Sequence, residues 1–152
     1  MIIYVDADAC PKAVKELIFR TAEKRQVKVI MVANNHISTP YSDFISNIIV
    51  KKGADEADDK IVELVKDNDL VISADVPLAD RVIEKGALVI TPYGKLYTKD
   101  DIKHFLAKRN FYTELRNNGT QTSGPPSFSN KEITAFANQL DRILTKMLKS
   151  SN

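Results

Sequence analysis

Short apolar runs alternate with helix-like stretches through the first ninety residues of this chain of 152 residues. Such runs are typical of strands buried on both faces of a sheet. We expect strands at residues 2–5, 27–32, 48–50, 70–73 and 88–91, and helices at about 11–24, 54–66 and 77–84. Strands that alternate with helices predict an α/β fold with a mainly parallel sheet of about five strands, joined by right-handed crossovers.

Beyond residue 98 the pattern becomes helical. Two further helices are expected near 99–109 and 130–149, and Ser129 or Asn130 is suited to cap the second of them. Between these helices, residues 117–127 are rich in Asn, Gly, Ser and Pro and are predicted to be flexible. We therefore expect one domain over 1–152, with an α/β core at about 1–98 and a helical extension at about 99–152. The apolar stripe of the last helix can pack on the body of the domain or supply the face of a homodimer.

The charge of the chain is unevenly distributed, although its formal net value is only +2. Residues 51–75 carry eight acids against four lysines, while residues 99–152 carry nine Lys and Arg against five acids. The single cysteine, Cys10, excludes an internal disulfide and an all-cysteine zinc site. The chain has no signal-peptide pattern and no apolar run of about 20 residues, so we expect a cytoplasmic protein without a membrane partner.

Aspartates follow two of the expected strands and begin the helix between them. The carboxyl ends of parallel strands meet at one edge of a sheet, where ligands bind. Taken singly these acids have structural explanations, since Asp8 and Asp75 could cap helices and Asp55 would be favoured by a helix dipole. Like charges that gather at one place are nevertheless unfavourable unless a cation neutralises them. Oxygen ligands without paired His or Cys suit Mg²⁺ or Mn²⁺. The candidate metal ligands are Asp6, Asp8, Asp55, Asp58, Asp59, Asp75 and Asp80.

Five segments of the chain carry a resemblance to a known family. They read VDADACP at 5–11, GADEADDKIV at 53–62, VISADVPLADR at 71–81, TPYGKLYT at 91–98 and SGPPSFS at 123–129. Together they resemble the bacterial YaiI/YqxD family of uncharacterised proteins over nearly the whole chain. A wider resemblance is to the PIN-like nucleases, including their NYN branch. That resemblance implies a three-layer PIN-like domain and metal-dependent phosphodiester hydrolysis, usually of RNA.

The PIN-like pattern can be carried over position by position. Asp6 matches the acid after the first strand, Asp58 or Asp59 the acid of the central helix, and Asp75 the acid after a later strand. Asp80 is a candidate for a fourth position, and Asp8 is an acid that the pattern lacks.

Our hypothesis takes Asp6, Asp59 and Asp75 as the catalytic residues, which coordinate one or two ions of Mg²⁺ or Mn²⁺. The other four aspartates are further ligands or support the ligands. Single-stranded RNA is the expected partner, and six cations near the edge are candidates to hold its phosphates: Lys12, Lys15, Lys51, Lys52, Arg81 and Lys95.

Three other interpretations remain open at this stage. The domain can keep the fold and the acids and act as a non-catalytic nucleic-acid-binding or regulatory module. The run Asp6-Ala7-Asp8 is also similar to the first motif of haloacid-dehalogenase-like phosphatases, although Cys10 stands where that motif has Thr or Ser. A cysteine hydrolase would use Cys10 with His36 or His104.

Overall fold

The computed structural model describes residues 1–53, 55–117 and 129–150, and of these the side chains of 110–117 and 149–150 are left undescribed. The expected α/β fold is confirmed, with a six-stranded sheet in the order β3-β2-β1-β4-β5-β6. The first five strands are parallel, and β6 pairs antiparallel with β5 as an addition to the five expected strands. The strands are β1 (Ile2–Asp6), β2 (Lys28–Ala33), β3 (Ile45–Ile49), β4 (Leu70–Ile72), β5 (Leu88–Ile90) and β6 (Leu96–Tyr97).

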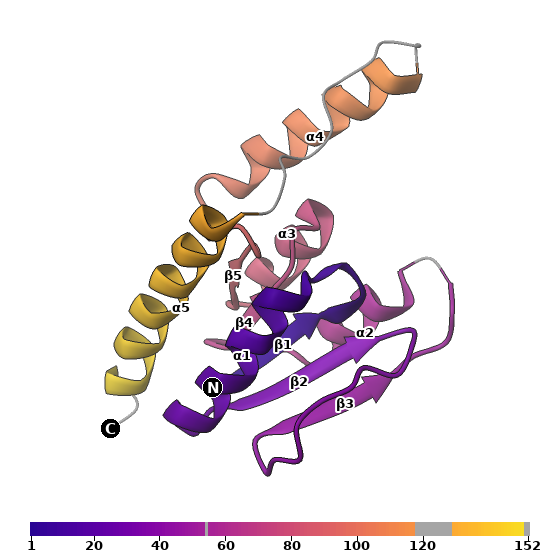
Figure 1. The fold of residues 1–152 in the computed structure, drawn as a ribbon. Coiled ribbons are helices and arrows are strands. Elements are labelled where there is room, and N and C mark those ends of the chain that lie inside the picture. The colour runs from indigo at the N-terminus through magenta and orange to yellow at the C-terminus, as the bar shows by residue number, and fades with distance from the viewer. Residues whose placement is uncertain (54, 118–128, 151–152) are drawn as a thin grey trace.

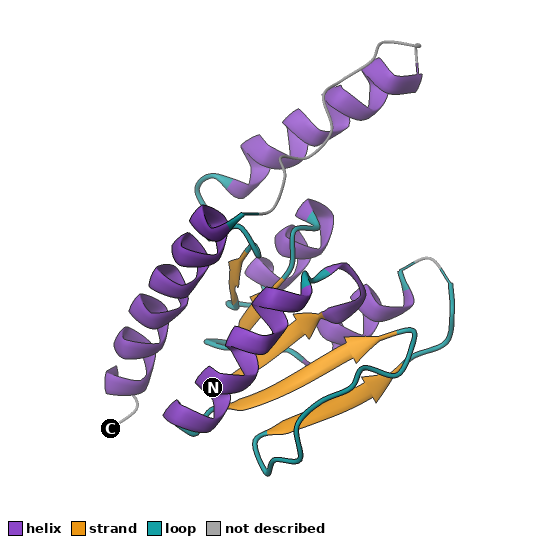
Figure 2. Ribbon diagram, in the orientation of Figure 1, coloured by secondary structure: helices purple, strands orange, loops and turns teal. Residues whose placement is uncertain are grey.

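Helices cover both faces of this sheet, which makes a three-layer arrangement (Figure 2). On one face α1 (Lys12–Arg25) and α5 (Asn130–Ser150) pack against a core that contains Ile3 and Val5 of β1. On the other face α2 (Glu56–Leu64), α3 (Val76–Glu84) and the start of α4 (Ile102–Asn117) pack against a core that contains Tyr4. Side chains alternate between the faces along a strand, so a strand covered on both sides must be apolar throughout.

The order of the strands creates a switch point between β1 and β4. From β1 the chain moves outward to β2 and β3, and it then returns to place β4 on the other side of β1 (Figure 1). Connections therefore leave the carboxyl ends of β1 and β4 in opposite directions. In an open α/β sheet this divergence makes the crevice in which ligands bind.

The connection from β2 to β3 contains no helix. Residues 34–44 return along the sheet as an irregular segment, as the sequence predicts for most of it. Asn47 of β3 holds this segment in place, because its Nδ2 donates to the carbonyl of Ile37 at 3.2 Å and to Thr39 Oγ1 at 3.4 Å. The flank of α1 that faces this segment is therefore covered by a loop and not by a second helix.

The apolar stripe of α5 packs on the body of the domain. Phe136, Leu140 and Leu144 are buried in the same core as α1 and the sheet. At the start of the helix, the backbone N–H and the hydroxyl of Ser129 both donate to Glu132 Oε2, which supports Ser129 as the cap. The apolar stripe of α5 is therefore buried against other parts of the same chain.

The predicted flexible stretch 117–127 lies outside the described residues except for Asn117, which ends α4. The helix α4 extends further than the expected 99–109, and Figure 1 shows it running away from the sheet. Among the described helices, none is both long enough and apolar enough to cross a membrane.

Candidate functional site

Ser73 joins the carboxyl ends of β1 and β4. Its hydroxyl donates to Asp6 Oδ2 at 3.0 Å, and it accepts a hydrogen bond from the backbone N–H of Asp75, also at 3.0 Å. Ser73 is only 2% exposed, so these contacts lie in the crevice itself. Ser73 is absent from the site residues predicted from the sequence, although a hydroxyl that ends a buried strand is a usable signal.

Asp75 is fixed by the helix that follows it. It is the N-cap of α3, and its Oδ1 accepts the backbone N–H of Leu78 at 3.0 Å. Pro77 in the first turn stabilises the same helix start. The capping role that the sequence suggests for Asp75 is therefore real, and it holds the carboxylate at the edge of the sheet beside Asp6.

Asp58 comes to the same place from the first turn of α2. Burial raises the pKa of Asp58 to about 7, with further increases from the negative charges of Asp75, Asp6 and Asp55. A hydrogen bond with Asp75, which only a protonated carboxyl can donate, acts in the same direction. Burial also raises the pKa of Asp6, against the hydrogen bond from Ser73 that lowers it, and Asp75 and Asp8 add to the rise. We call Asp6, Asp58 and Asp75 the acid edge.

Asp8 and Asp55 lie around the acid edge and are exposed to solvent. The strand β1 ends at Asp6, and residues 7–9 form a 3₁₀ turn, so Asp6 and Asp8 are not placed on one side by strand alternation. Instead Asp8 Oδ2 accepts the backbone N–H of Asn34 at 2.7 Å, which links this turn to the end of β2. Asp55 precedes α2 with a positive φ of 66°, a conformation that aspartate tolerates better than most residues.

The other two candidate ligands have cationic partners. Asp59 Oδ1 lies 2.9 Å from Arg81 Nη1, and Asp80 Oδ1 lies 2.6 Å from Lys103 Nζ. Either Asp58 or Asp59 fits the central-helix position in the sequence, and our hypothesis placed Asp59 with Asp6 and Asp75. The structure corrects this choice: Asp58 lies with them, whereas Asp59 points to Arg81 of α3 and forms an ion pair with it.

The candidate phosphate-binding cations also divide into those with and those without a charged partner. Lys51 and Lys52 are exposed in the connection that leaves the carboxyl end of β3, and Lys12 is exposed at the start of α1 beside the half-buried Lys15. Lys95, in contrast, has its own neighbours. Its Nζ lies 3.3 Å from Asp101 Oδ2 and 5.0 Å from the centre of the Phe105 ring.

Cys10 lies in the core beside the acid edge. It is 7% exposed, and burial raises the pKa of its thiol to about 12, with Asp6 adding to the rise and Lys15 opposing it. A nucleophilic cysteine needs a thiolate near neutral pH. The structure therefore favours a packing role for Cys10 over the hydrolase interpretation.

The acid edge is not a closed metal site in its present geometry. Within residues 1–53, 55–117 and 129–150, no group of three or more His, Cys, Asp and Glu side chains is arranged to hold a metal ion. What the site does contain is a set of mutually repelling carboxyl groups, of which Asp6 is held by Ser73 and Asp75 by the start of α3. Such a set can bind a cation or a proton.

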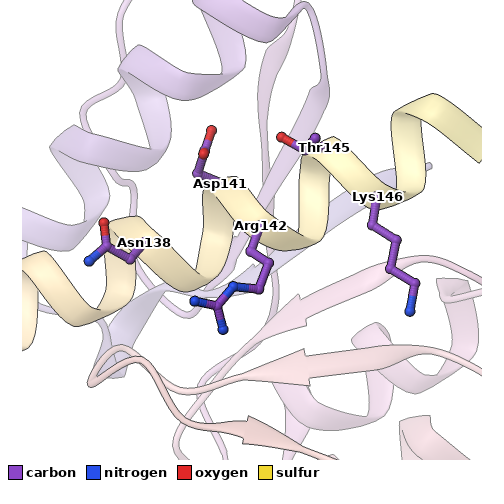
Figure 3. Close-up of a pocket in the computed structure, with 5 residues that line it drawn as sticks. All are labelled: Asn138, Asp141, Arg142, Thr145 and Lys146. Atoms are coloured by element: carbon purple, nitrogen blue, oxygen red, sulfur yellow. The ribbon is translucent and has the colours of Figure 1, made fainter.

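A second hollow, of about 500 Å³, lies far along the chain on α5. Its lining residues come from that helix alone, as Figure 3 shows: Asn138, Asp141, Arg142, Thr145 and Lys146. Arg25 of α1 donates to Asp141 Oδ1 at 3.0 Å and to Thr145 Oγ1 at 3.1 Å. Two of the lining side chains thus fasten α5 to α1, and we assign this surface a structural role.

Comparison with known proteins gives a consistent result. A family model described as "uncharacterized BCR, YaiI/YqxD family" matches residues 4–146. A "UPF0178 protein" of Maridesulfovibrio salexigens is 53% identical over 148 residues, which cover 97% of this chain and 98% of the relative. Another from Herminiimonas arsenicoxydans is 51% identical over 146 residues, covering 96% of this chain and 98% of that protein. No solved structure matches.

Proposed function

This chain belongs to the YaiI/YqxD family, and we propose that it is a nuclease that uses Mg²⁺ or Mn²⁺ to hydrolyse phosphodiester bonds in single-stranded RNA. One observation carries the proposal. Asp6, Asp58 and Asp75 converge from three separate segments, and none of them forms an ion pair with a described Lys or Arg. Carboxylates that repel one another lower the stability of the folded protein unless a bound cation offsets their charge, and such groups are typical of functional sites.

The donor chemistry fits a hard divalent cation, since all three groups offer carboxylate oxygens. A bound cation of this kind lowers the pKa of a water ligand and stabilises negative charge on a phosphate. Neighbouring groups fix two of the three carboxylates: Ser73 orients Asp6, and the start of α3 orients Asp75. Asp58 must release the proton that it holds at a pKa of about 7 before it can act as a ligand. Binding of the cation is therefore expected to strengthen above pH 7.

The surroundings of the acid edge are suited to a polyanion. Lys12, Lys51 and Lys52 are exposed at the carboxyl side of the sheet, and none of them forms an ion pair within the described part of the chain. Unpaired cations near an acidic centre attract phosphates and release counterions when they bind. This arrangement supports a phosphate-containing substrate in preference to an uncharged one.

The first test measures metal binding through its effect on the melting temperature at pH 8. A cation present at ten times its dissociation constant stabilises a folded protein by about 1.4 kcal/mol, which is about 3–6 °C for a chain of this size. We expect this shift with Mg²⁺ or Mn²⁺ in the wild type and its loss in Asp6→Asn/Asp75→Asn and in Asp58→Asn. Asp59→Asn is the matched control, because it removes an acid one residue away and should keep the shift.

The second test is cleavage of a labelled single-stranded RNA with Mn²⁺. We expect Asp58→Asn to reduce the rate by at least about 100-fold, and Asp59→Asn to change it by less than about threefold. A wild type that neither shifts in melting temperature nor cuts RNA would contradict the proposal. Equal cleavage by Asp58→Asn and the wild type would contradict the assignment of the site.

A second candidate function is supported by the open geometry of the acid edge. Because no described group of three ligands is closed around a metal position, the domain can act as a nucleic-acid-binding module without catalysis. RNA binding that persists in EDTA, with no product after long incubation with Mn²⁺, would favour this alternative.

A further inference from the structure

A long groove runs beside α1, on the flank that faces the irregular connection from β2 to β3. Its first part has a volume of about 610 Å³ and lies between the start of α1 and residues 36–40. A second part, of about 440 Å³, continues toward the end of α1. Phe19 and Pro40 line both parts, so the two are adjacent, and we call them together the α1 groove.

Four cations lie along the helical wall of the α1 groove. The first part contains Lys12 and Lys15, and the second contains Arg20 and Lys24. A helix rises 1.5 Å per residue, so the four positive groups extend over about 18 Å of the helix axis. That length matches several phosphates of an extended single strand better than one small anion.

These four cations lack the partners that other cations of the protein have. None of them forms an ion pair with any residue that the structure describes, whereas Arg81, Lys95 and Lys103 all do. The groove also contains two acids, Glu16 and Glu23, which leaves an excess of positive charge along its length. An excess of positive charge along a groove wall is complementary to a phosphate backbone.

The opposite wall offers polar groups above an apolar floor. Ser38 and Thr39 line the first part with His36, and the packing of Asn47 against Thr39 keeps this wall in a defined conformation. Phe19 is almost completely buried and forms part of the floor. Hydroxyl and imidazole groups beside cations are common partners of phosphate oxygens.

The α1 groove begins next to the acid edge. Lys12 follows the turn that contains Asp8, and the opposite wall begins at His36, two residues after Asn34, whose backbone N–H donates to Asp8 Oδ2. Lys15 is close enough to influence the pKa of Cys10, and Asp6 influences the same thiol. One end of the groove therefore opens at the carboxyl edge of the sheet, and the other lies near its amino edge.

From these observations we infer that the α1 groove binds the backbone of a single-stranded nucleic acid and leads it to the acid edge. The inference rests on the proposed function in that the acid edge acts on the same strand. It adds the path of the substrate and assigns Arg20, Lys24, His36, Ser38 and Thr39 to its binding. It also implies that a strand must extend several nucleotides beyond the acid edge to bind well.

The test measures binding without cleavage. Fluorescence anisotropy in EDTA, with a labelled single-stranded RNA of twelve nucleotides, would compare the wild type with Lys12→Gln/Lys15→Gln/Arg20→Gln/Lys24→Gln. We expect at least about a tenfold loss of affinity at low salt. The slope of log affinity against log salt should fall by about 3, since each phosphate contact on a single strand contributes about 0.7.

Two further variants separate a specific groove from a general effect of charge. Lys66→Gln/Lys131→Gln removes exposed cations outside the groove and should leave affinity and slope almost unchanged. Glu16→Gln/Glu23→Gln removes the acids inside the groove and should strengthen binding by about two- to tenfold. A trinucleotide should bind far more weakly than the twelve-nucleotide strand.

The outcomes distinguish this inference from the proposed function. Unchanged affinity in the fourfold variant, or no RNA binding by the wild type, would overturn the groove even if the enzyme cuts RNA. Loss of binding in the fourfold variant together with a wild type that shows no cleavage would support the groove and contradict the nuclease. Circular dichroism of each variant confirms that the fold is retained.

Discussion

The aspartates at the two ends of the central strand pair, β1 and β4, have opposite surroundings. At the amino end, Asp69 is 6% exposed, and its two oxygens accept the backbone N–H groups of Ile2 at 2.9 Å and Lys66 at 3.0 Å. At the carboxyl end, Asp6 and Asp75 face another acid, and burial together with like charge raises the pKa of Asp58 to about 7. Aspartate is therefore balanced by backbone hydrogen bonds at the amino end, whereas at the carboxyl end its charge is left available for a ligand.

This difference separates structural acids from functional candidates more clearly than burial does. Asp69 is the more buried group, but backbone donors balance its charge and leave it little capacity for a ligand. The acid edge has few donors and an excess of negative charge. Variants at the two ends should therefore change stability in opposite directions.

The largest effect is expected at Asp69. Asp69→Ala leaves two partly buried backbone N–H groups without their acceptor, which should lower the free energy of unfolding by about 2–4 kcal/mol. Urea denaturation measures the change. Asp100→Ala, which removes an exposed acid, is the control and should stay within about 0.5 kcal/mol of the wild type. Equal stability of the two variants would show that the amino end does not depend on this carboxylate.

The opposite sign is expected at Asp58. Its pKa is about 7 in the folded protein against 3.8 as the ordinary value, so the folded state holds the proton more tightly than the unfolded state. This contribution to stability is complete below about pH 4 and is lost as the pH rises through 7. The group is only half-buried and solvent screens it, so we expect a loss of about 1–2 kcal/mol.

Asp58→Asn should remove that pH dependence. In metal-free buffer at pH 8 the variant should be more stable than the wild type by about 1–2 kcal/mol, and the two should converge near pH 4. Asp59→Asn is the control one residue away, and it should gain nothing because Asp59 already has Arg81 as a partner. A variant at Asp58 that is less stable than the wild type at pH 8 would show that the acid edge is not under electrostatic strain.

The smallest effect is expected at Arg81. Its ion pair with Asp59 lies at the surface, where both side chains are well exposed, and such pairs contribute less than about 1 kcal/mol. Arg81→Gln should therefore lower the free energy of unfolding only slightly, and high salt should reduce the difference further. A loss above about 2 kcal/mol, measured by urea denaturation, would mean that Arg81 also compensates the acid edge.

The sequence predicted the main features because they follow from local patterns. Apolar runs marked the strands, and the end of each run located Asp6 and Asp75 at the carboxyl edge. The choice between Asp58 and Asp59 could not be made in this way. Adjacent residues of a helix point about 100° apart, and the outcome depends on where α3 places Arg81, which is a tertiary contact.

Other features depended on contacts between distant segments. The strand β6 has two residues and follows a tight turn in which the backbone N–H of Thr91 donates to the carbonyl of Lys95 at 2.8 Å. This turn packs on α5, where a Cβ at Gly94 would lie 2.7 Å from the backbone of Ala135. The α1 groove exists because residues 34–44 connect two parallel strands without a helix. Its cations at Arg20 and Lys24 are ordinary surface residues in the sequence, and only the position of that connection gives them a common wall.

The order of the strands also has a consequence for how the protein is made. The pairs β1–β2 and β2–β3 bring together segments that are close in the chain, but Ile3 of β1 pairs with Leu70 of β4, 67 residues away. Distant pairings demand more loop-closure entropy and are slower to form. A growing chain that has not yet produced β4 carries Asp6 and Asp58 but lacks Ser73 and Asp75. We therefore expect the mutual repulsion of these carboxyl groups to arise late in folding, when the two halves of the sheet meet.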